Sequence, residues 1–233
     1  IRANARRKPA LSILLHGQYA SQHNYILPML EAQGLRATLA VSVSAIGGSR
    51  MSAAQLDRAY GAGHEIALRC FNDSIFTDGY QSAANFADAA AITADINAGW
   101  DYFRTRGWDR GIGYLNHGGS VMPWAGTVSA ARQAVVLAGF QAAGVRAASA
   151  GDANAVGPLN RCQSMARSTN VDPLTIQGAL QAGSTHASAD LIAVATRAKA
   201  RGEWGLITLH ESVVSGAAGL QVLNSDLFTA VQS

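Results

Sequence analysis

The sequence lacks several features that would place it in a well-marked class of protein. No apolar run reaches about 18 residues, the length that a membrane-spanning helix needs. The chain has no Gly-rich phosphate loop, no G-x-S-x-G turn and no His-Glu-x-x-His helix. It has only 2 cysteines, and nothing around them resembles a cysteine-based zinc site. None of these short motifs therefore indicates a function, and the candidate residues must be found in another way.

Charge is also scarce, at 14% of residues, whereas hydrophobic residues make up 48% and are ample for a core. The net charge is +3, and one short basic run comprises Arg6, Arg7 and Lys8. No basic helix or interleaved aromatic residue accompanies this run, which favours a solvated linker over a nucleic-acid contact. We therefore expect no nucleic-acid partner and no membrane span.

The beginning of the chain also bears on its domain organisation. It starts with Ile1 rather than Met, and no apolar signal segment follows. We expect part of a larger or processed protein, with residues 1–10 as a linker and residues 11–233 as a single domain. Cys70 and Cys162 lie far apart in the sequence, so a disulfide and two buried thiols both remain open.

Short apolar runs alternate with helical patterns along the chain, which predicts βα units and a mainly parallel sheet. This alternation favours one (β/α) barrel over two domains. The expected strands are 11–15, 36–41, 64–69, 112–116, 145–148 and 205–209, with a weaker pattern at 161–166. The expected helices are 21–33, 52–62, 83–106, 128–143, 188–200 and 225–231.

Polar residues follow three of these strands at their C-terminal ends. His16 ends the first strand, Arg69 and Asp73 follow the third, and His210 and Glu211 follow the last. In barrels of strands and helices, these strand ends form the active site. We therefore expect the two histidines, the arginine and the aspartate to converge at one end of the barrel. Glu211 should point to the other side of its strand as a surface or loop carboxylate.

Several stretches resemble the polysaccharide deacetylases, also called carbohydrate esterase family four. Gln18-Tyr-Ala-Ser-Gln, Tyr25-Ile-Leu-Pro-Met-Leu and Gly34-Leu-Arg-Ala-Thr resemble the family's first strand and helix. Ala62-Gly-His-Glu-Ile and Trp204-Gly-Leu-Ile-Thr-Leu-His resemble its third and last strands. The resemblance spans nearly all of 9–231 and implies a deformed (β/α)7 barrel that acts on a polysaccharide, outside the cell or at its surface.

The family's catalytic and metal-binding positions differ in this chain. Its catalytic Asp and first metal-binding Asp are replaced by His16 and Gly17, and its two metal-binding histidines fall on Arg69 and Asp73. Its final histidine, a general acid, is retained as His210. Gly17 offers no side-chain ligand, Arg69 carries a fixed positive charge, and one aspartate alone makes no zinc site. We therefore expect neither the family's metal nor any other cofactor.

Four further candidates have two interpretations, and a fifth has one. Arg69 and Asp73 form an ion pair where two histidines stand in the family, or Arg69 binds an acidic sugar through two hydrogen bonds. Asn116 and His117 bind sugar hydroxyls or belong to a loop. Trp124, in the loop 120–126, is the best candidate for a platform under a sugar ring.

Two functions fit these residues. The first is an enzyme that cleaves an acidic polysaccharide by β-elimination or another acid–base route. Its conservative version is a metal-independent esterase, or an esterase whose metal ion is bound at another position. In the polysaccharide-cleaving enzyme His16 is the base, His210 the acid, Asp73 a member of the catalytic set, and Arg69 the partner of a carboxylate. The second is a non-catalytic glycan-binding module that uses the same cleft and Trp124. Most of the family's site positions carry polar residues here rather than small apolar ones, which favours the enzyme. The fold alone does not separate the two functions.

Overall fold

The computed structural model describes residues 9–75, 79–116, 128–150, 176–177, 180–181, 187–202, 204–217 and 221–232. Three expected features lie outside these ranges, namely His117, Trp124 and the strand at 161–166. Cys162 lies outside them too, whereas Cys70 is a buried free thiol.

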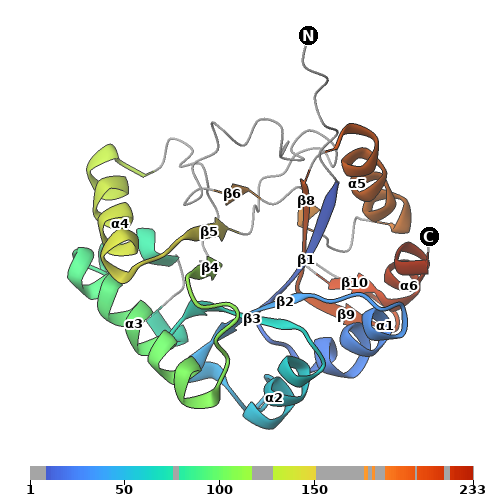
Figure 1. Cartoon of the computed structure of the whole chain (residues 1–233), viewed down its shortest axis with the longest axis horizontal. Helices are drawn as coiled ribbons and strands as arrows, with labels where there is room; N and C mark the ends of the chain where they lie inside the picture. The colour runs from blue at the N-terminus through green and yellow to red at the C-terminus, as the bar shows by residue number, and fades with distance from the viewer. Residues whose placement is uncertain are drawn as a thin grey trace.

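Within the described ranges, a parallel sheet of eight strands forms the centre of the molecule, in the order β6-β5-β4-β3-β2-β1-β8-β7. Figure 1 shows the sheet curling from β5 through β2 to β8. The strands are β1 (Ala10–His16), β2 (Thr38–Ser42), β3 (Glu65–Cys70), β4 (Tyr114–Asn116), β5 (Ala147–Ala150), β6 (Ile176–Gln177), β7 (Leu180–Gln181) and β8 (Trp204–Leu209).

The two outermost strands of this order show how the barrel closes. β6 and β7 are separated by only two residues in the chain, yet they stand at opposite ends of the sheet. β6 pairs with β5, and β7 pairs with β8. If this stretch is counted as one strand position, the sheet returns onto itself with seven positions. The expected deformed (β/α)7 barrel is therefore confirmed, and the strands β6 and β7, which the sequence did not predict, supply its seventh position.

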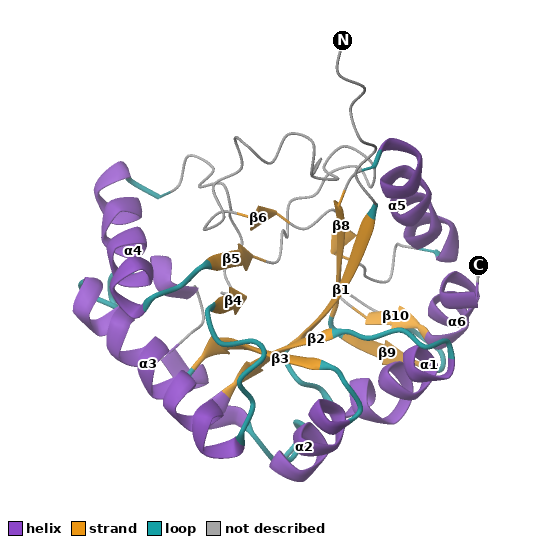
Figure 2. Ribbon diagram, viewed as in Figure 1, coloured by secondary structure: helices purple, strands orange, loops and turns teal. Residues whose placement is uncertain are grey.

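Helices surround the strands on the outside of the sheet (Figure 2). They are α1 (Leu27–Ala32), α2 (Ala53–Gly61), α3 (Ala89–Arg106), α4 (Ala130–Ala143), α5 (Ser188–Arg201) and α6 (Asn224–Gln232). Four short turns complete the described helical segments, namely a π-helical turn η1 (Gln22–Ile26) and the 3-10 turns η2 (Val43–Ala45), η3 (Asp73–Ile75) and η4 (Gly79–Gln81).

Local capping explains where the helices begin. Ser52 and Gln55 exchange side-chain and backbone hydrogen bonds, a capping box that starts α2. The Asp88 side chain accepts from the N–H of Ala91, so α3 begins at Ala89 rather than at the expected residue 83. The helix expected at 21–33 is also different, because its first turn is the π-helical η1 and only its second part is α-helical. Such turns are frequent at functional sites.

The strands bury apolar residues on both faces. Those that face outward, such as Leu39 and Leu68, pack with the helices in a large core that contains Trp100. Those that face inward form a second cluster, which includes Leu14 and Ala40. Successive side chains alternate between the two faces of a strand. The residues two positions beyond Leu14 and Ala40 therefore also face the barrel interior, at the C-terminal ends of the strands.

A short parallel pair that the sequence did not predict follows β8. It consists of β9 (Glu211–Val213) and β10 (Gln221–Leu223). Glu211 is partly buried there and accepts a hydrogen bond of 3.2 Å from the Gln221 side chain, so it has a structural contact. Of the helices described, none combines the length and the apolar character that crossing a membrane would take.

Candidate functional site

Polar side chains gather where the inward-facing rows of strand residues reach the C-terminal end of the barrel. The register between neighbouring strands places them on one side of the sheet. We call this set the barrel mouth. It consists of His16, Ser42, Arg69, Asn116, Ser149 and His210.

The two histidines of the barrel mouth lie against each other. The ring centroids of His16 and His210 are 4.7 Å apart, and each residue is only 8% exposed. The buried Gln22 holds the backbone beside both rings, because its Nε2 donates to the carbonyl oxygen of His16 at 2.9 Å and to that of His210 at 2.5 Å. The turn η1 thus joins the ends of β1 and β8, which bring together two of the residues expected from the sequence.

His210 is held in its neutral form. Its pKa is lowered to about 4, mainly by burial and in addition by the positive charges of Arg69 and Arg50. Its Nδ1 is buried and has no hydrogen-bond partner within the described part of the chain. At pH 7 a neutral imidazole can accept a proton, or a hydrogen bond from a ligand.

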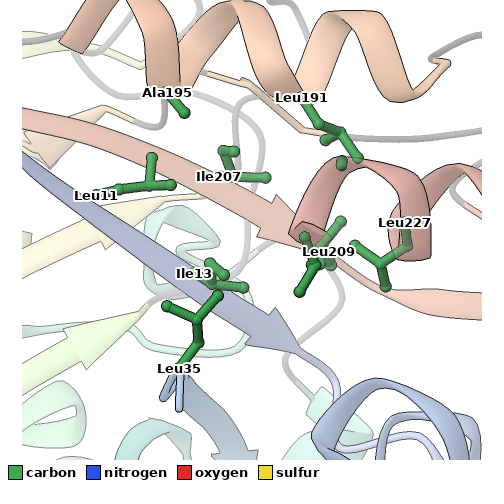
Figure 3. A pocket seen from close by; sticks show the side chains of 10 residues that line it. Leu11, Ile13, Leu35, Leu191, Ala195, Ile207, Leu209 and Leu227 are labelled. Carbon is green, nitrogen blue, oxygen red and sulfur yellow. The ribbon is translucent and has the colours of Figure 1, made fainter. Parts of the chain in front are cut away.

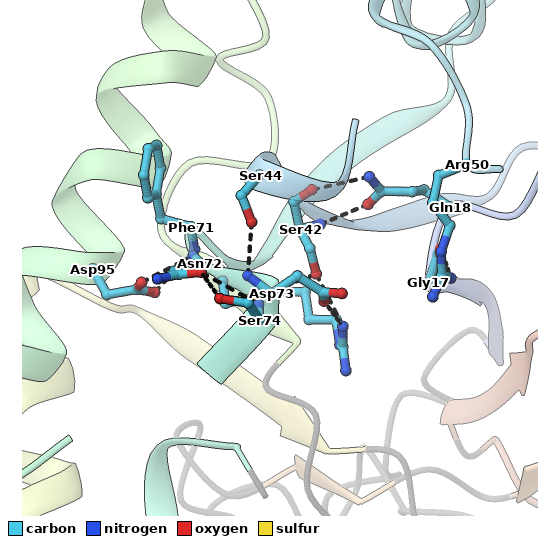
Figure 4. A network of polar contacts seen from close by, with 12 residues as sticks. Gly17, Gln18, Ser42, Ser44, Arg50, Phe71, Asn72, Asp73, Ser74 and Asp95 are labelled. Carbon is cyan, nitrogen blue, oxygen red and sulfur yellow. Dashed lines mark hydrogen bonds and ion pairs between the residues drawn. The ribbon is translucent and has the colours of Figure 1, made fainter. Parts of the chain in front are cut away.

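Arg69 and Asp73 form an ion pair, one of the two arrangements expected from the sequence. Arg69 Nη1 also donates to Ser42 Oγ at 3.0 Å, and the backbone N–H of Asp73 donates to Ser44 Oγ at 2.8 Å. Figure 4 shows this network extending along β2 toward Gln18. The two charged side chains are 18% and 28% exposed, so a ligand can reach them.

Asp95 fixes the loop that carries Asp73. Its carboxylate accepts from the backbone N–H of Phe71 at 2.9 Å and of Asn72 at 3.1 Å. It also accepts from the hydroxyl of Tyr80 at 2.7 Å. Because Asp95 belongs to α3, the loop is tied to a long helix and Asp73 keeps its place beside Arg69.

Gln18 extends the pairing of β1 with β2 beyond the last strand residue. Its side-chain amide donates to the carbonyl of Ser42 at 2.9 Å and accepts from the N–H of Ser42 at 2.6 Å. Gln18 is fully buried and has a φ of +44°, a left-handed conformation that is uncommon outside glycine. The two hydrogen bonds offset the cost of this conformation and fix the loop between His16 and η1.

Asn116, expected as a ligand for sugar hydroxyls, lies on the opposite wall of the barrel mouth. Its Nδ2 donates to the carbonyl of Ser149 at 3.2 Å and to Ser149 Oγ at 3.0 Å. Ser149 also forms a hydrogen bond with the hydroxyl of Tyr114. Burial raises the pKa of Tyr114 to about 12. The Oδ1 of Asn116 is buried without a hydrogen-bond partner among the described residues, and is therefore a second acceptor for a ligand.

The resemblance predicts the family's metal positions at Gly17, Arg69 and Asp73. Gly17 offers only its backbone, and its carbonyl accepts a hydrogen bond from Arg50. Arg69 brings a fixed positive charge and is already paired with Asp73. In the ranges that the structure describes, no three His, Cys, Asp or Glu side chains come together as metal ligands.

The sequence did not reveal Gln18, Gln22 or Arg50 as part of this region. A glutamine near the start of a helix is usually exposed, and only the packed barrel shows that both of these are buried. Arg50 comes from the loop between η2 and α2, which follows β2 and so lies on the same side as the barrel mouth. The sequence signal that could have indicated these three residues was their position, because Gln18 and Gln22 follow β1 and Arg50 follows β2.

An apolar pocket lies on the outer side of the sheet (Figure 3). Its walls come from β1, β8, α5, α6 and the segment after α1, and its described lining has no polar side chain that could orient or transform a ligand. The barrel mouth therefore remains the candidate site. The pocket is lined by Leu11, Ile13, Leu35, Leu191, Ala195, Ile207, Leu209, Leu227, Ala230 and Val231.

Comparison with known proteins shows the fold. No family model and no curated protein matches the sequence. A family 4 carbohydrate esterase from Streptomyces lividans, solved with acetate, matches with a TM-score of 0.52 and 12% identity over 96% of this chain and 86% of its own. The catalytic domain of a peptidoglycan N-acetylglucosamine deacetylase from Eubacterium rectale matches with a TM-score of 0.51 and 10% identity over 99% and 85%. The chain thus has the fold of the family 4 carbohydrate esterases and polysaccharide deacetylases along nearly its whole length.

Proposed function

We propose that this domain acts on a polysaccharide through acid–base chemistry in the barrel mouth, without a metal ion at the family's position. The observation that carries the proposal is the buried pair His16 and His210, with the Arg69 charge acting on it. A polysaccharide substrate is supported by the matched carbohydrate esterase and peptidoglycan deacetylase, whose fold this chain shares.

The lowered pKa of His210 supports a base in this position rather than the acid that the resemblance implies. In an acidic polysaccharide, His210 would take the hydrogen from the carbon next to the carboxylate. Arg69 would pair with that carboxylate and stabilise the charge that develops on it. The electron pair then forms a double bond and expels the glycosidic oxygen, which gains a proton from His16 or from water.

Ester or acetyl hydrolysis is the conservative version of the same proposal. His210 would then take a proton from the attacking water, and Asn116 would bind sugar hydroxyls. The two reactions leave different products, an unsaturated sugar in the first and free acetate in the second. We further propose that residues 11–233 act as one domain of a larger protein, outside the cell or at its surface, because polysaccharides of these kinds occur there.

The test compares purified variants on acetylated polysaccharides and on uronic-acid polysaccharides. His210→Ala should lower turnover by about 100-fold or more, the usual scale for losing a general acid or base. Arg69→Ala should mainly weaken binding of an acidic substrate, with folding checked because Asp73 loses its partner. His23→Ala is the control, since His23 lies outside the barrel mouth. Full activity in both folded mouth variants would show that the chemistry lies elsewhere.

A glycan-binding module without turnover is the second candidate. The observation that favours it is the pair of buried acceptors, Asn116 Oδ1 and His210 Nδ1, which suit sugar hydroxyls as well as catalysis. If the wild type binds a glycan but converts none, and Trp124→Ala abolishes the binding, this second function holds and the enzymatic proposal does not.

A further inference from the structure

Gly17 is enclosed by side chains that leave no room for the aspartate found at this position in the family. A Cβ added to Gly17 would lie 2.7 Å from Tyr19 Cε2 and 2.9 Å from Arg50 Nη1. Its φ of +89° would strain any other residue as well. The space that a metal-binding side chain would need is therefore filled by an aromatic ring and a guanidinium group.

Arg50 is held firmly in this place. Its Nη1 donates to the carbonyl oxygen of Gly17, and its guanidinium lies 4.0 Å from the centroid of the Tyr19 ring. An isolated antiparallel bridge between Tyr19 and Arg50 fixes the backbone of both loops. A guanidinium has five N–H donors, and the described hydrogen bonds of Arg50 use one nitrogen atom. The group is thus positioned by its surroundings and keeps donors for a ligand.

A second guanidinium, that of Arg69, is linked to the loop of Gly17, because it donates to Ser42 and the backbone of Ser42 pairs with the Gln18 side chain. Ser42 and Asp73 orient it. Among the described residues, Arg69 and Arg50 both place positive charge near His210, and Asp73 is the ion-pair partner of Arg69. The buried Nδ1 of His210 has no hydrogen-bond partner among the described residues and is available to a ligand.

We infer that Arg50 and Arg69 form a binding site for a carboxylate group, such as that of a uronic acid, where the related fold carries a metal ion. The inference rests on the proposed function for the sugar that bears this group. Carboxylates are among the anions that guanidinium groups bind with two parallel hydrogen bonds, and they are the anionic groups of uronic-acid polysaccharides. Arg50 is thereby a specificity residue that selects acidic over neutral glycans.

The experiment titrates the full chain with sodium glucuronate and with methyl glucoside, and follows the imidazole signals of His210 by NMR. Glucuronate should shift these signals in a saturable way and raise the pKa of His210, because an anion beside the ring favours its charged form. Methyl glucoside should do neither. Arg50→Gln should weaken glucuronate binding by about 10-fold or more, the usual scale for a hydrogen bond to a charged group.

Two further variants make the result specific. Asp73→Asn should strengthen glucuronate binding, since it removes the negative charge that competes for Arg69. Arg36→Gln is the matched control, because Arg36 is exposed, precedes β2 and lies at the other end of the barrel. Circular dichroism checks folding, and Arg50→Lys, which keeps the charge, should bind more tightly than Arg50→Gln.

Three outcomes would overturn the inference. They are no saturable shift in the wild type, unchanged affinity in folded Arg50→Gln, or stoichiometric zinc binding that Asp73→Asn abolishes. Failure of the proposed function gives a different result from failure of this inference. A protein that binds glucuronate through Arg50 and converts no polysaccharide supports the site alone, whereas one that deacetylates a neutral polysaccharide and ignores glucuronate supports only the function.

Discussion

Gln22 should be the residue whose loss most directly separates the two histidines. It is fully buried, and its one amide nitrogen donates to the backbone of two strands that are far apart in sequence. Gln22→Leu keeps most of the side-chain volume but removes both donors. The carbonyl oxygens of His16 and His210 then lose these partners in a buried place.

The size of the effect follows from these two bonds. A hydrogen bond contributes about 0.5–1.5 kcal/mol net to stability, so Gln22→Leu should cost about 1–3 kcal/mol. Gln22→Glu should cost more at neutral pH, because a carboxylate would face two carbonyl oxygens. The pKa of the introduced carboxyl should be raised in the folded state, so this variant should be most stable at low pH and lose stability as pH rises through that pKa.

Urea denaturation at several pH values measures these differences. Gln141→Leu is the matched control, because Gln141 is exposed on α4 and has no part in the barrel mouth. The ring signals of His16 and His210 should also move in Gln22→Leu, since their backbone is no longer clamped. A change below about 0.5 kcal/mol, the range of ordinary surface substitutions, together with unmoved ring signals would refute the clamp.

Two more predictions concern the same region. The pKa of His210 is about 4 in the folded chain against 6.5 for an unperturbed histidine, so the unfolded state binds more protons between these values and stability should fall as pH drops through this window. The loss should reach up to about 3 kcal/mol, and His210→Gln should flatten it in urea denaturation; an equal slope in the variant would contradict a neutral buried ring. Gly17→Ala should destabilise more than Gly34→Ala, because both have positive φ but an added Cβ meets other atoms only at Gly17. Gly34→Ala should cost about 1–2 kcal/mol from conformation alone, and equal costs in thermal unfolding would show that Tyr19 and Arg50 simply move aside.

The fold was predictable because its signals are local and repeated. Apolar strands alternate with helices that end in glycine, and Gly107 and Gly144 adopt the left-handed conformation that suits a helix end. Other boundaries depended on a single side chain, as where Asp88 delays the start of α3. The strand pieces at 176–181 are only two residues each, too short for a periodic pattern to show them.

The candidate site was predictable only in part, for a physical reason. His16, Arg69, Asp73 and His210 each follow a strand, and parallel strands deliver such residues to one end of a barrel. The partners that orient them come from loops, and Gln22, Gln18 and Arg50 act through buried contacts to backbone atoms or to glycine. No spacing in the sequence encodes contacts of this kind, and whether His117 and Trp124 join the site stays a prediction.

The two arginines near His210 also bear on the reaction that we propose for the barrel mouth. A metal ion can lower the pKa of bound water and so produce a hydroxide nucleophile at neutral pH, whereas a guanidinium group cannot. A guanidinium can neutralise a substrate carboxylate and stabilise the charge that builds up when the neighbouring carbon loses a proton. With Arg69 and Arg50 beside a neutral His210, the second kind of chemistry is the better match. β-Elimination from an acidic polysaccharide therefore uses more of what the described residues provide than hydrolysis of an acetyl group does.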